Sequence, residues 1–124
     1  MAYYAGTQAD ELLPDWQTHF ANVTTSHFDP FQTHLITGAA GLTVTIQESI
    51  TALAQAHRTV TILCGVPDSG TIVSRAGLDT IQSGASNGTT LTNSSGRVGD
   101  FVTLSQLTAA TWTVQQQKGE WTLA

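Results

Sequence analysis

Four histidines are the residues of this chain whose type could bind a metal ion: His19, His27, His34 and His57. Histidine nitrogens are common zinc ligands, and Asp29 would point the same way as the His27 ring on an extended chain. The spacing between the four histidines matches no ligand pattern of known metal sites. We therefore expect ordinary surface or capping histidines. The alternative is a metal ion held by one histidine from each of three chains.

Residues 84–88, Gly-Ala-Ser-Asn-Gly, match the pattern G-x-S-x-G, which places a nucleophilic serine on a turn between a strand and a helix. The following Thr-Thr-Leu-Thr is a poor helix start, and 124 residues are too few for an α/β-hydrolase scaffold. We therefore interpret Ser86 as part of a glycine-rich loop.

The carboxylates form no pair suited to acid–base catalysis. Asp10 and Glu11 are adjacent in a solvated segment, Asp68 and Asp79 fall in predicted turns, and Asp100 precedes a predicted strand. An Asp at a strand start usually makes an Asx-type hydrogen bond with the backbone. Together with the serine loop, these carboxylates predict that the chain is not an enzyme and carries no cofactor or metal.

Few residues are charged: 10%, against roughly 25% in ordinary soluble domains. The net charge of −5, with four Lys and Arg against nine Asp and Glu, would repel phosphate backbones, so we expect no nucleic-acid partner. No apolar run is long enough to cross a bilayer, and the N-terminus does not resemble a signal peptide. We therefore expect a soluble protein made in the cytoplasm, without a membrane partner. Its single cysteine, Cys64, lies in an apolar run and predicts a buried, inert thiol.

The last quarter of the chain, residues 97–124, carries apolar side chains two residues apart, which is the spacing of one face of a β-strand. The pairs are Val102 and Leu104, Trp112 and Val114, and Trp121 and Leu123. Only short connections separate them, so we predict three antiparallel neighbours, with Gly119 adopting the positive φ of a tight hairpin.

Upstream, threonines alternate with apolar residues and predict further strands near residues 42–46, 60–62, 71–75, 78–82 and 89–92. Residues 48–57 fit one or two helical turns, and residues 49–53 fit equally well a short strand, which we favour. The pair Asn87-Gly88 is a hairpin signal.

These patterns predict an all-β domain over residues 33–124. We expect about eight short antiparallel strands in a jelly-roll, sandwich or β-tulip-like arrangement. The expected core comprises Val44, Ile46, Val60, Ile62, Val102, Leu104, Trp112, Val114 and Trp121.

Residues 1–32 differ from the rest, because they hold six of the nine aromatic residues, four acids and no Lys or Arg. Pro14 separates two short helical pieces expected at residues 10–13 and 15–21. Large rings are costly to leave in water and are common in interface cores, so we predict a docking arm. The alternative is an arm that folds back over its own β domain. The six aromatics are Tyr3, Tyr4, Trp16, Phe20, Phe28 and Phe31.

Three short motifs of the last quarter, Gly99-Asp-Phe-Val-Thr-Leu104, Ala110-Thr-Trp-Thr-Val114 and Gly119-Glu-Trp121, occur in that order. As an ordered set they resemble the C-terminal β module of small virion proteins of tailed bacteriophages, of the head-decoration and head-fibre type. The likeness extends more loosely over residues 49–53 and 58–62. This family implies a homotrimeric β domain on the particle surface.

Charge and length narrow what the resemblance implies. An acidic protein suits the outer surface of the shell better than one facing DNA, and a long fibre would need a repeat or coiled-coil shaft. We therefore expect a trimeric capsid decoration, or cement, protein on the capsid exterior. Its arm would grip the major capsid protein, and three arms would add avidity.

The alternative is a glycan-binding, receptor-recognition module of a tail or head fibre, with a surface glycan as its partner. An exposed Trp112 or Trp121 would then stack on a sugar ring while polar side chains bind its hydroxyls. Because each tryptophan shares its predicted strand face with an aliphatic neighbour, we expect both in the core.

Overall fold

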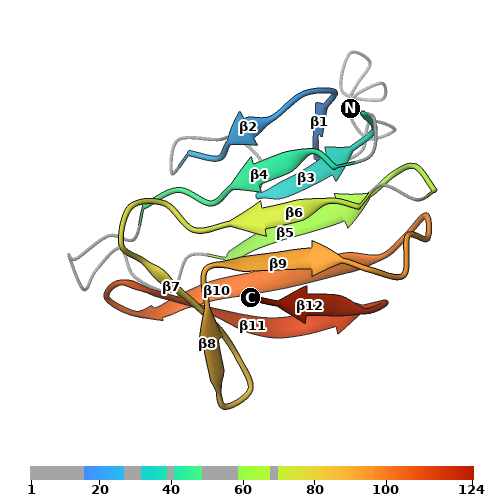
Figure 1. Cartoon of the computed structure of the whole chain (residues 1–124). Coiled ribbons are helices and arrows are strands. Elements are labelled where there is room, and N and C mark those ends of the chain that lie inside the picture. The colour runs from blue at the N-terminus through green and yellow to red at the C-terminus, as the bar shows by residue number, and fades with distance from the viewer. Residues whose placement is uncertain (1–15, 27–31, 39–40, 49–58, 68–69) are drawn as a thin grey trace, which may run out of the picture.

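A computed structural model describes residues 16–26, 32–38, 41–48, 59–67 and 70–124 of the chain. This part contains twelve strands in two sheets and no helix (Figure 1). Accordingly, none of the described residues belongs to a helix that could span a bilayer. The strands are β1 (Gln17–His19), β2 (Val23–Thr24), β3 (Thr33–Ile36), β4 (Thr43–Thr45), β5 (Thr59–Cys64), β6 (Ile72–Ser74), β7 (Thr80–Ser83), β8 (Ser86–Gly88), β9 (Thr90–Asn93), β10 (Phe101–Thr108), β11 (Thr111–Lys118) and β12 (Trp121–Leu123).

Up to β6, successive strands belong alternately to the two sheets. The larger sheet has the order β1-β3-β5-β10-β11-β7-β8, and the smaller has the order β12-β9-β6-β4-β2. After one strand in each sheet, the chain re-enters the first sheet running in its original direction. Strands β1, β3 and β5 are therefore parallel, as are β2, β4 and β6. We call residues 16–74 the parallel coil.

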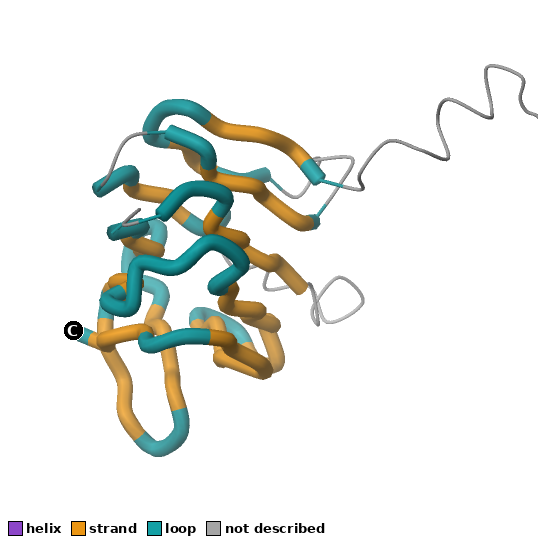
Figure 2. Tube along the Cα trace, turned by 90° about the vertical axis from the view of Figure 1, so that its right-hand side faces the viewer, coloured by secondary structure: helices purple, strands orange, loops and turns teal. Residues whose placement is uncertain are grey.

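Residues 80–124, the C-terminal half, contain hairpins instead. The pairs β7–β8 and β10–β11 are antiparallel neighbours within the larger sheet. Antiparallel pairs β10–β5 and β9–β6 join this half to the parallel coil. The coil forms the upper part of Figure 1 and the C-terminal half the lower part. In Figures 1 and 2 the β7–β8 hairpin, at one edge of the larger sheet, extends below the other strands.

One hydrophobic core lies between the sheets. In β5, for example, Val60 and Ile62 are fully buried, whereas Thr61 and Leu63 between them are partly exposed, because side chains alternate along a strand. Burying an aliphatic side chain of this size stabilises the fold by about 1.5–3 kcal/mol. The buried core comprises Ile36, Val44, Ile46, Val60, Ile62, Val73, Ile81, Leu91, Val102, Leu104 and Trp112.

The prediction of an all-β domain is confirmed, but the antiparallel jelly roll is wrong. Five of the ten strand pairs are parallel, mainly because the parallel coil crosses between the sheets after each strand. The helical turn expected over residues 15–21 is also wrong, because residues 17–19 pair with β3 as strand β1.

The last three strands do not form one meander. Strand β12 leaves β11 and pairs with β9 in the smaller sheet. Gly119 has the predicted positive φ, 87°. A Cβ on Gly119 would lie 2.5 and 2.6 Å from the carboxylate oxygens of Asp100, so only glycine fits where the chain crosses against this side chain.

The hairpin signal at residues 87–88 also misplaced a turn. The chain turns at residues 84–85, and Asn87 lies in β8, paired with Gln82. A Cβ on Gly88 would lie 2.5 Å from the carbonyl oxygen of Ala124. This glycine therefore permits close packing of the C-terminal residue and is not part of the turn.

Two further predictions, the helical piece at residues 10–13 and the strand or helical turn at residues 49–53, lie outside the described residues.

Candidate functional site

Residues 16–26, the described end of the predicted docking arm, connect the edges of the two sheets. Strand β1 forms an edge of the larger sheet, and β2 an edge of the smaller one. The N–H of Thr37 donates to the carbonyl of His19 (3.0 Å), and the N–H of Thr25 donates to the carbonyl of Thr45 (2.9 Å). These bonds extend the two ladders, so this segment is built into both sheets.

The structure describes two of the six arm aromatics. Phe20, between β1 and β2, is 74% exposed, whereas Trp16 is partly buried. Phenylalanine is among the residues most often buried, so this exposed ring is a candidate contact for a partner. The other four, Tyr3, Tyr4, Phe28 and Phe31, lie outside the described residues.

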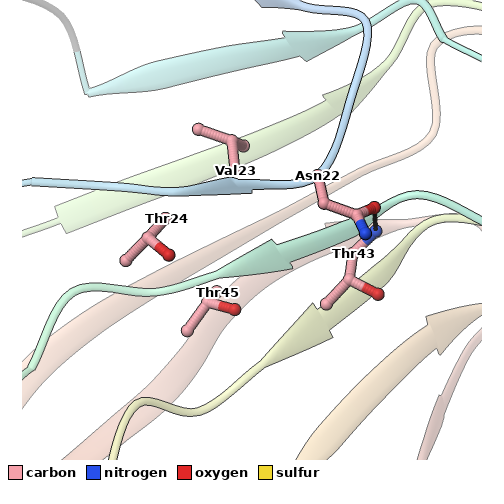
Figure 3. Close-up of a pocket in the computed structure, with 5 residues that line it drawn as sticks. All are labelled: Asn22, Val23, Thr24, Thr43 and Thr45. Atoms are coloured by element: carbon pink, nitrogen blue, oxygen red, sulfur yellow. Dashed lines mark hydrogen bonds between the residues drawn. The ribbon is translucent and has the colours of Figure 1, made fainter.

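A groove of about 340 Å³ lies on β2 and β4, at the edge of the smaller sheet (Figure 3). The parallel pairing of these strands sets Thr24 beside Thr45. Just before β2, Oδ1 of Asn22 accepts a hydrogen bond of 2.9 Å from the N–H of Thr43. The lining comprises Asn22, Val23, Thr24, Thr43 and Thr45, none of them charged.

The polar side chains of this groove retain hydrogen-bonding capacity. In the part of the chain that the structure describes, the hydroxyls of Thr24, Thr43 and Thr45 and the Nδ2 of Asn22 bind no other protein group. A hydroxyl has one donor and two acceptor sites, and an amide NH₂ has two donors. The groove can therefore both donate and accept hydrogen bonds without carrying charge.

His19 and His34 form a hydrogen bond between β1 and β3, with 2.8 Å between Nε2 and Nδ1. The ring centroids are 5.1 Å apart, and the ring planes differ by 22°. Because this separation matches the N–N distance plus the two ring radii, the nitrogens face each other along the line between the ring centres. One nitrogen must donate and the other accept, so the contact holds a single proton. Two nitrogens bound to one tetrahedral zinc ion would lie about 3.3 Å apart, and their lone pairs would point at the ion and not at each other.

His34 is therefore not the surface histidine that we expected. It is 1% exposed, because it shares the core-facing side of β3 with Ile36. The described residues contain no group of three or more His, Cys, Asp or Glu that could hold a metal ion. His27, Asp29 and His57 lie outside the described residues.

Asp100 is held at the start of β10 by the preceding loop. Its Oδ2 accepts hydrogen bonds from Nδ2 of Asn93 (3.0 Å), Oγ of Ser95 (2.5 Å) and the N–H of Arg97 (3.2 Å). Burial raises the pKa of this carboxyl, but the hydrogen bonds and the Arg97 charge outweigh it, so the pKa of Asp100 lies below its usual value. A backbone N–H is among the donors, but it belongs to Arg97, three residues before Asp100, whereas the donor of an Asx-type bond follows the Asp. We call Asn93, Ser95, Arg97 and Asp100 the Asp100 cluster.

The Asp100 cluster also reaches the crossing between β11 and β12. Oγ of Ser95 accepts a hydrogen bond of 2.8 Å from the N–H of Glu120, and the N–H of Ser94 donates to the Glu120 carbonyl (2.8 Å). The cluster thus fixes the path of the chain at this crossing.

The serine lies on an exposed strand, and the cysteine is buried. Ser86 is an exposed residue of β8, and a strand follows it instead of the helix that a nucleophile elbow requires. Cys64 is 1% exposed, and its Sγ donates to Oγ1 of Thr71 at 3.7 Å.

The tryptophans proposed to stack on sugar lie against the core. Trp112 is fully buried and cannot contact a ligand. Trp121 is partly buried, and its Nε1 donates to the carbonyl of Lys118 (3.1 Å). Among the other predicted core residues, Val114 is partly buried, and those fully buried are Val44, Ile46, Val60, Ile62, Val102 and Leu104.

The groove was not predicted from the sequence. The order Thr43-Val-Thr45 indicates two threonines on one strand face, but it does not indicate what lies beside them. Asn22 and Thr24 reach this face only through the parallel pairing of β2 with β4, which has no local signal.

Comparison with family models, with curated proteins and with solved structures finds no match to this chain.

Proposed function

We propose that the chain is a structural protein of a tailed-phage virion: a homotrimeric capsid decoration protein. Its arm docks on the major capsid protein at the outer surface of the shell, and its β domain forms the exposed body. The protein stabilises the shell by adding contacts between capsid subunits.

The observation that carries the proposal is the exposed Phe20. A ring that is 74% exposed sits on a segment tied to both sheets, at the end of the aromatic-rich arm. Burying such a ring against a partner removes a large apolar surface from water. The two sheets hold the backbone around Phe20, so docking orders little further chain there.

The C-terminal motifs add support, because they meet in space. Gly99-Asp100 opens β10, and Gly119 passes against the Asp100 carboxylate where β11 leads to β12. The first and third motifs of the phage-like set therefore belong to one structural unit, as expected of motifs that define a module.

Charge supports the outer face of the shell. The net charge of −5 is unsuited to a surface facing packaged DNA. Three arms on one trimer would make release require three simultaneous detachments, which raises the effective affinity without any single strong contact.

The test combines solution mass with binding to virions of the phage that encodes the chain. We expect three times the chain mass by light scattering. Deleting residues 1–15 keeps all twelve strands of the described residues, so this variant should remain a folded trimer. It retains Phe20 but lacks Tyr3 and Tyr4, so it should bind particles stripped of the protein more weakly than the full chain does.

Matched substitutions locate the contact. Phe20→Ser should weaken particle binding at least about tenfold, since each arm loses a ring that docking on the capsid would bury. Leu78→Ser is the control: Leu78 is 88% exposed and lies by the β10–β11 turn, where the N–H of Thr80 binds the Ala110 carbonyl. A monomer in solution, or particle binding unaffected by the deletion, would overturn the proposal.

A further inference from the structure

We propose that the groove on β2 and β4 binds a neutral carbohydrate chain. This inference does not depend on the virion role, and it uses none of the tryptophans. It rests on the five lining residues, on their free hydrogen-bonding groups and on the row of hydroxyls that continues from the groove across the smaller sheet.

The chemistry of the lining selects the class of ligand. Phosphate and carboxylate groups are bound by cationic side chains or clustered N–H donors, and cations are bound by carboxylates. The lining residues, Asn22, Val23, Thr24, Thr43 and Thr45, have no charged side chain. A purely apolar ligand would bury the three hydroxyls and the amide without hydrogen bonds, which is unfavourable.

A sugar hydroxyl matches the uncharged donors and acceptors of the groove. Threonine hydroxyls and sugar hydroxyls each donate one hydrogen bond and accept two, so they can pair in either direction. Nδ2 of Asn22 adds two donors, while its Oδ1 is held by the N–H of Thr43 at 2.9 Å, which orients the amide. The threonine methyl groups supply apolar contact for the C–H face of a sugar ring.

The row of hydroxyls favours a chain of sugars over a single unit. Thr24 on β2 lies beside Thr45 on β4, which lies beside Ser74 on β6 and then Thr90 on β9. Residues in register across a sheet lie on the same face, and neighbouring strands are about 4.8 Å apart, so this row spans about 14 Å. An oligosaccharide lying across the strands could contact the groove at one end and Thr90 at the other.

The groove is shallow, and its lining offers few contacts. We therefore expect a dissociation constant on the order of 1 mM for one chain. A trimer would bind a surface that carries many copies of the glycan more tightly, through avidity.

The test is saturation-transfer difference NMR on the full chain with neutral hexasaccharides, namely maltohexaose, cellohexaose and hexa-N-acetylchitohexaose, at millimolar concentration. A heparin hexasaccharide is the anionic comparison. We expect transfer to at least one neutral hexamer, weaker transfer to its monosaccharide, and none to heparin.

The double variant Thr43→Val/Thr45→Val should bind the responding hexamer at least about tenfold more weakly, because two hydroxyls are replaced by methyl groups of the same shape. Thr92→Val is the matched control: it makes the same change on the same face of the sheet, on β9, outside the groove. Circular dichroism and thermal unfolding verify that all variants are folded.

No transfer to any of the three neutral hexamers would overturn the proposal. So would equal binding by the double variant and the wild type, or stronger transfer to heparin than to the neutral sugars. A chain that fails to trimerise or to bind virions can still pass this test, so failure of the decoration role and failure of the carbohydrate site are distinguishable.

Discussion

The groove of the parallel coil and the Asp100 cluster of the C-terminal half use the same polar residue types in opposite ways. In the C-terminal half, Asn93, Ser95 and Asp100 pair with one another and with nearby backbone groups. In the parallel coil, Asn22 and the threonines of the groove leave most of their hydrogen-bonding groups facing outward. Residue type alone therefore does not decide whether a polar side chain stabilises the fold or remains available to a ligand. Paired polar groups hold the fold, and outward ones are available to a ligand.

Of the variants considered, Gly119→Ala should lower the free energy of unfolding the most. Its Cβ would displace the Asp100 carboxylate and its hydrogen bonds, and alanine at a φ of 87° adds backbone strain. We expect the free energy of unfolding to fall by about 4 kcal/mol, as measured by urea denaturation.

Gly41→Ala in the parallel coil is the matched control. Gly41 has nearly the same φ, 83°, but a Cβ there meets no atom of the described residues within 4 Å. The free energy of unfolding of Gly41→Ala should fall only by the cost of a positive φ for alanine, about 1 kcal/mol. Equal losses in the two variants would show that the contact of Gly119 with Asp100 has no energetic importance.

Asp100→Asn should lower the free energy of unfolding by about 2 kcal/mol at pH 7, because an amide cannot accept all the bonds that the carboxylate accepts. The lowered pKa of Asp100 makes this difference depend on pH. The carboxylate stabilises the fold above the unfolded pKa of about 3.9, and this contribution disappears as pH falls through the folded pKa.

The difference in free energy of unfolding between the wild type and Asp100→Asn should therefore become smaller below about pH 4. Urea denaturation across pH measures it. Glu120→Gln is the control, because this exposed side chain lies next to the cluster and is not one of the groups bound to Asp100. A gap that stays constant with pH would contradict the role assigned to the carboxylate.

His19→Phe should have a smaller effect, about 1 kcal/mol, because it removes the hydrogen bond to Nδ1 of His34. The loss should be local to the edge strand β1. Hydrogen exchange at the N–H of Thr37, which binds the His19 carbonyl, should become faster. Thr18→Val, on the exposed side of β1, should leave that exchange rate unchanged.

The groove variant Thr43→Val/Thr45→Val should change the free energy of unfolding by less than about 0.5 kcal/mol, since these hydroxyls bind no other group of the described chain. Thr25→Val makes the same substitution at a buried site of the coil. The hydroxyl of Thr25 binds the Gln47 side chain and accepts the Gln47 N–H (2.9 Å), so this variant should lose about 2 kcal/mol. If both variants lost the same amount, the distinction between paired and outward hydroxyls would fail.

Strands were predictable where the apolar alternation is uninterrupted. Val60 and Ile62 in β5, and Val102 and Leu104 in β10, show it plainly and are buried. Strands β1 and β3 were missed because polar side chains occupy core-facing positions, such as His34 beside Ile36, and these conceal the period of two.

Partners of the strands were less predictable than the strands. Gly119 was correctly expected to have a positive φ, but its neighbour across the crossing is Asp100, which redirects β12 to the other sheet. The candidate site depends on the same kind of contact, because Asn22 meets Thr43 only where two strands far apart in sequence become neighbours.

The sequence by itself determined that this chain forms β-strands, which residues of the clearest strands face inward, and that its surface is rich in hydroxyls and poor in charge. These properties follow from the order of side chains along one segment, and strand periodicity expresses that order directly. Only the tertiary structure decided that the chain coils between two sheets, that Asp100 is enclosed, and that a neutral groove lies on β2 and β4. Each of these depends on pairing between distant segments, and the free energy of that pairing belongs to the assembled sheets and to no segment alone.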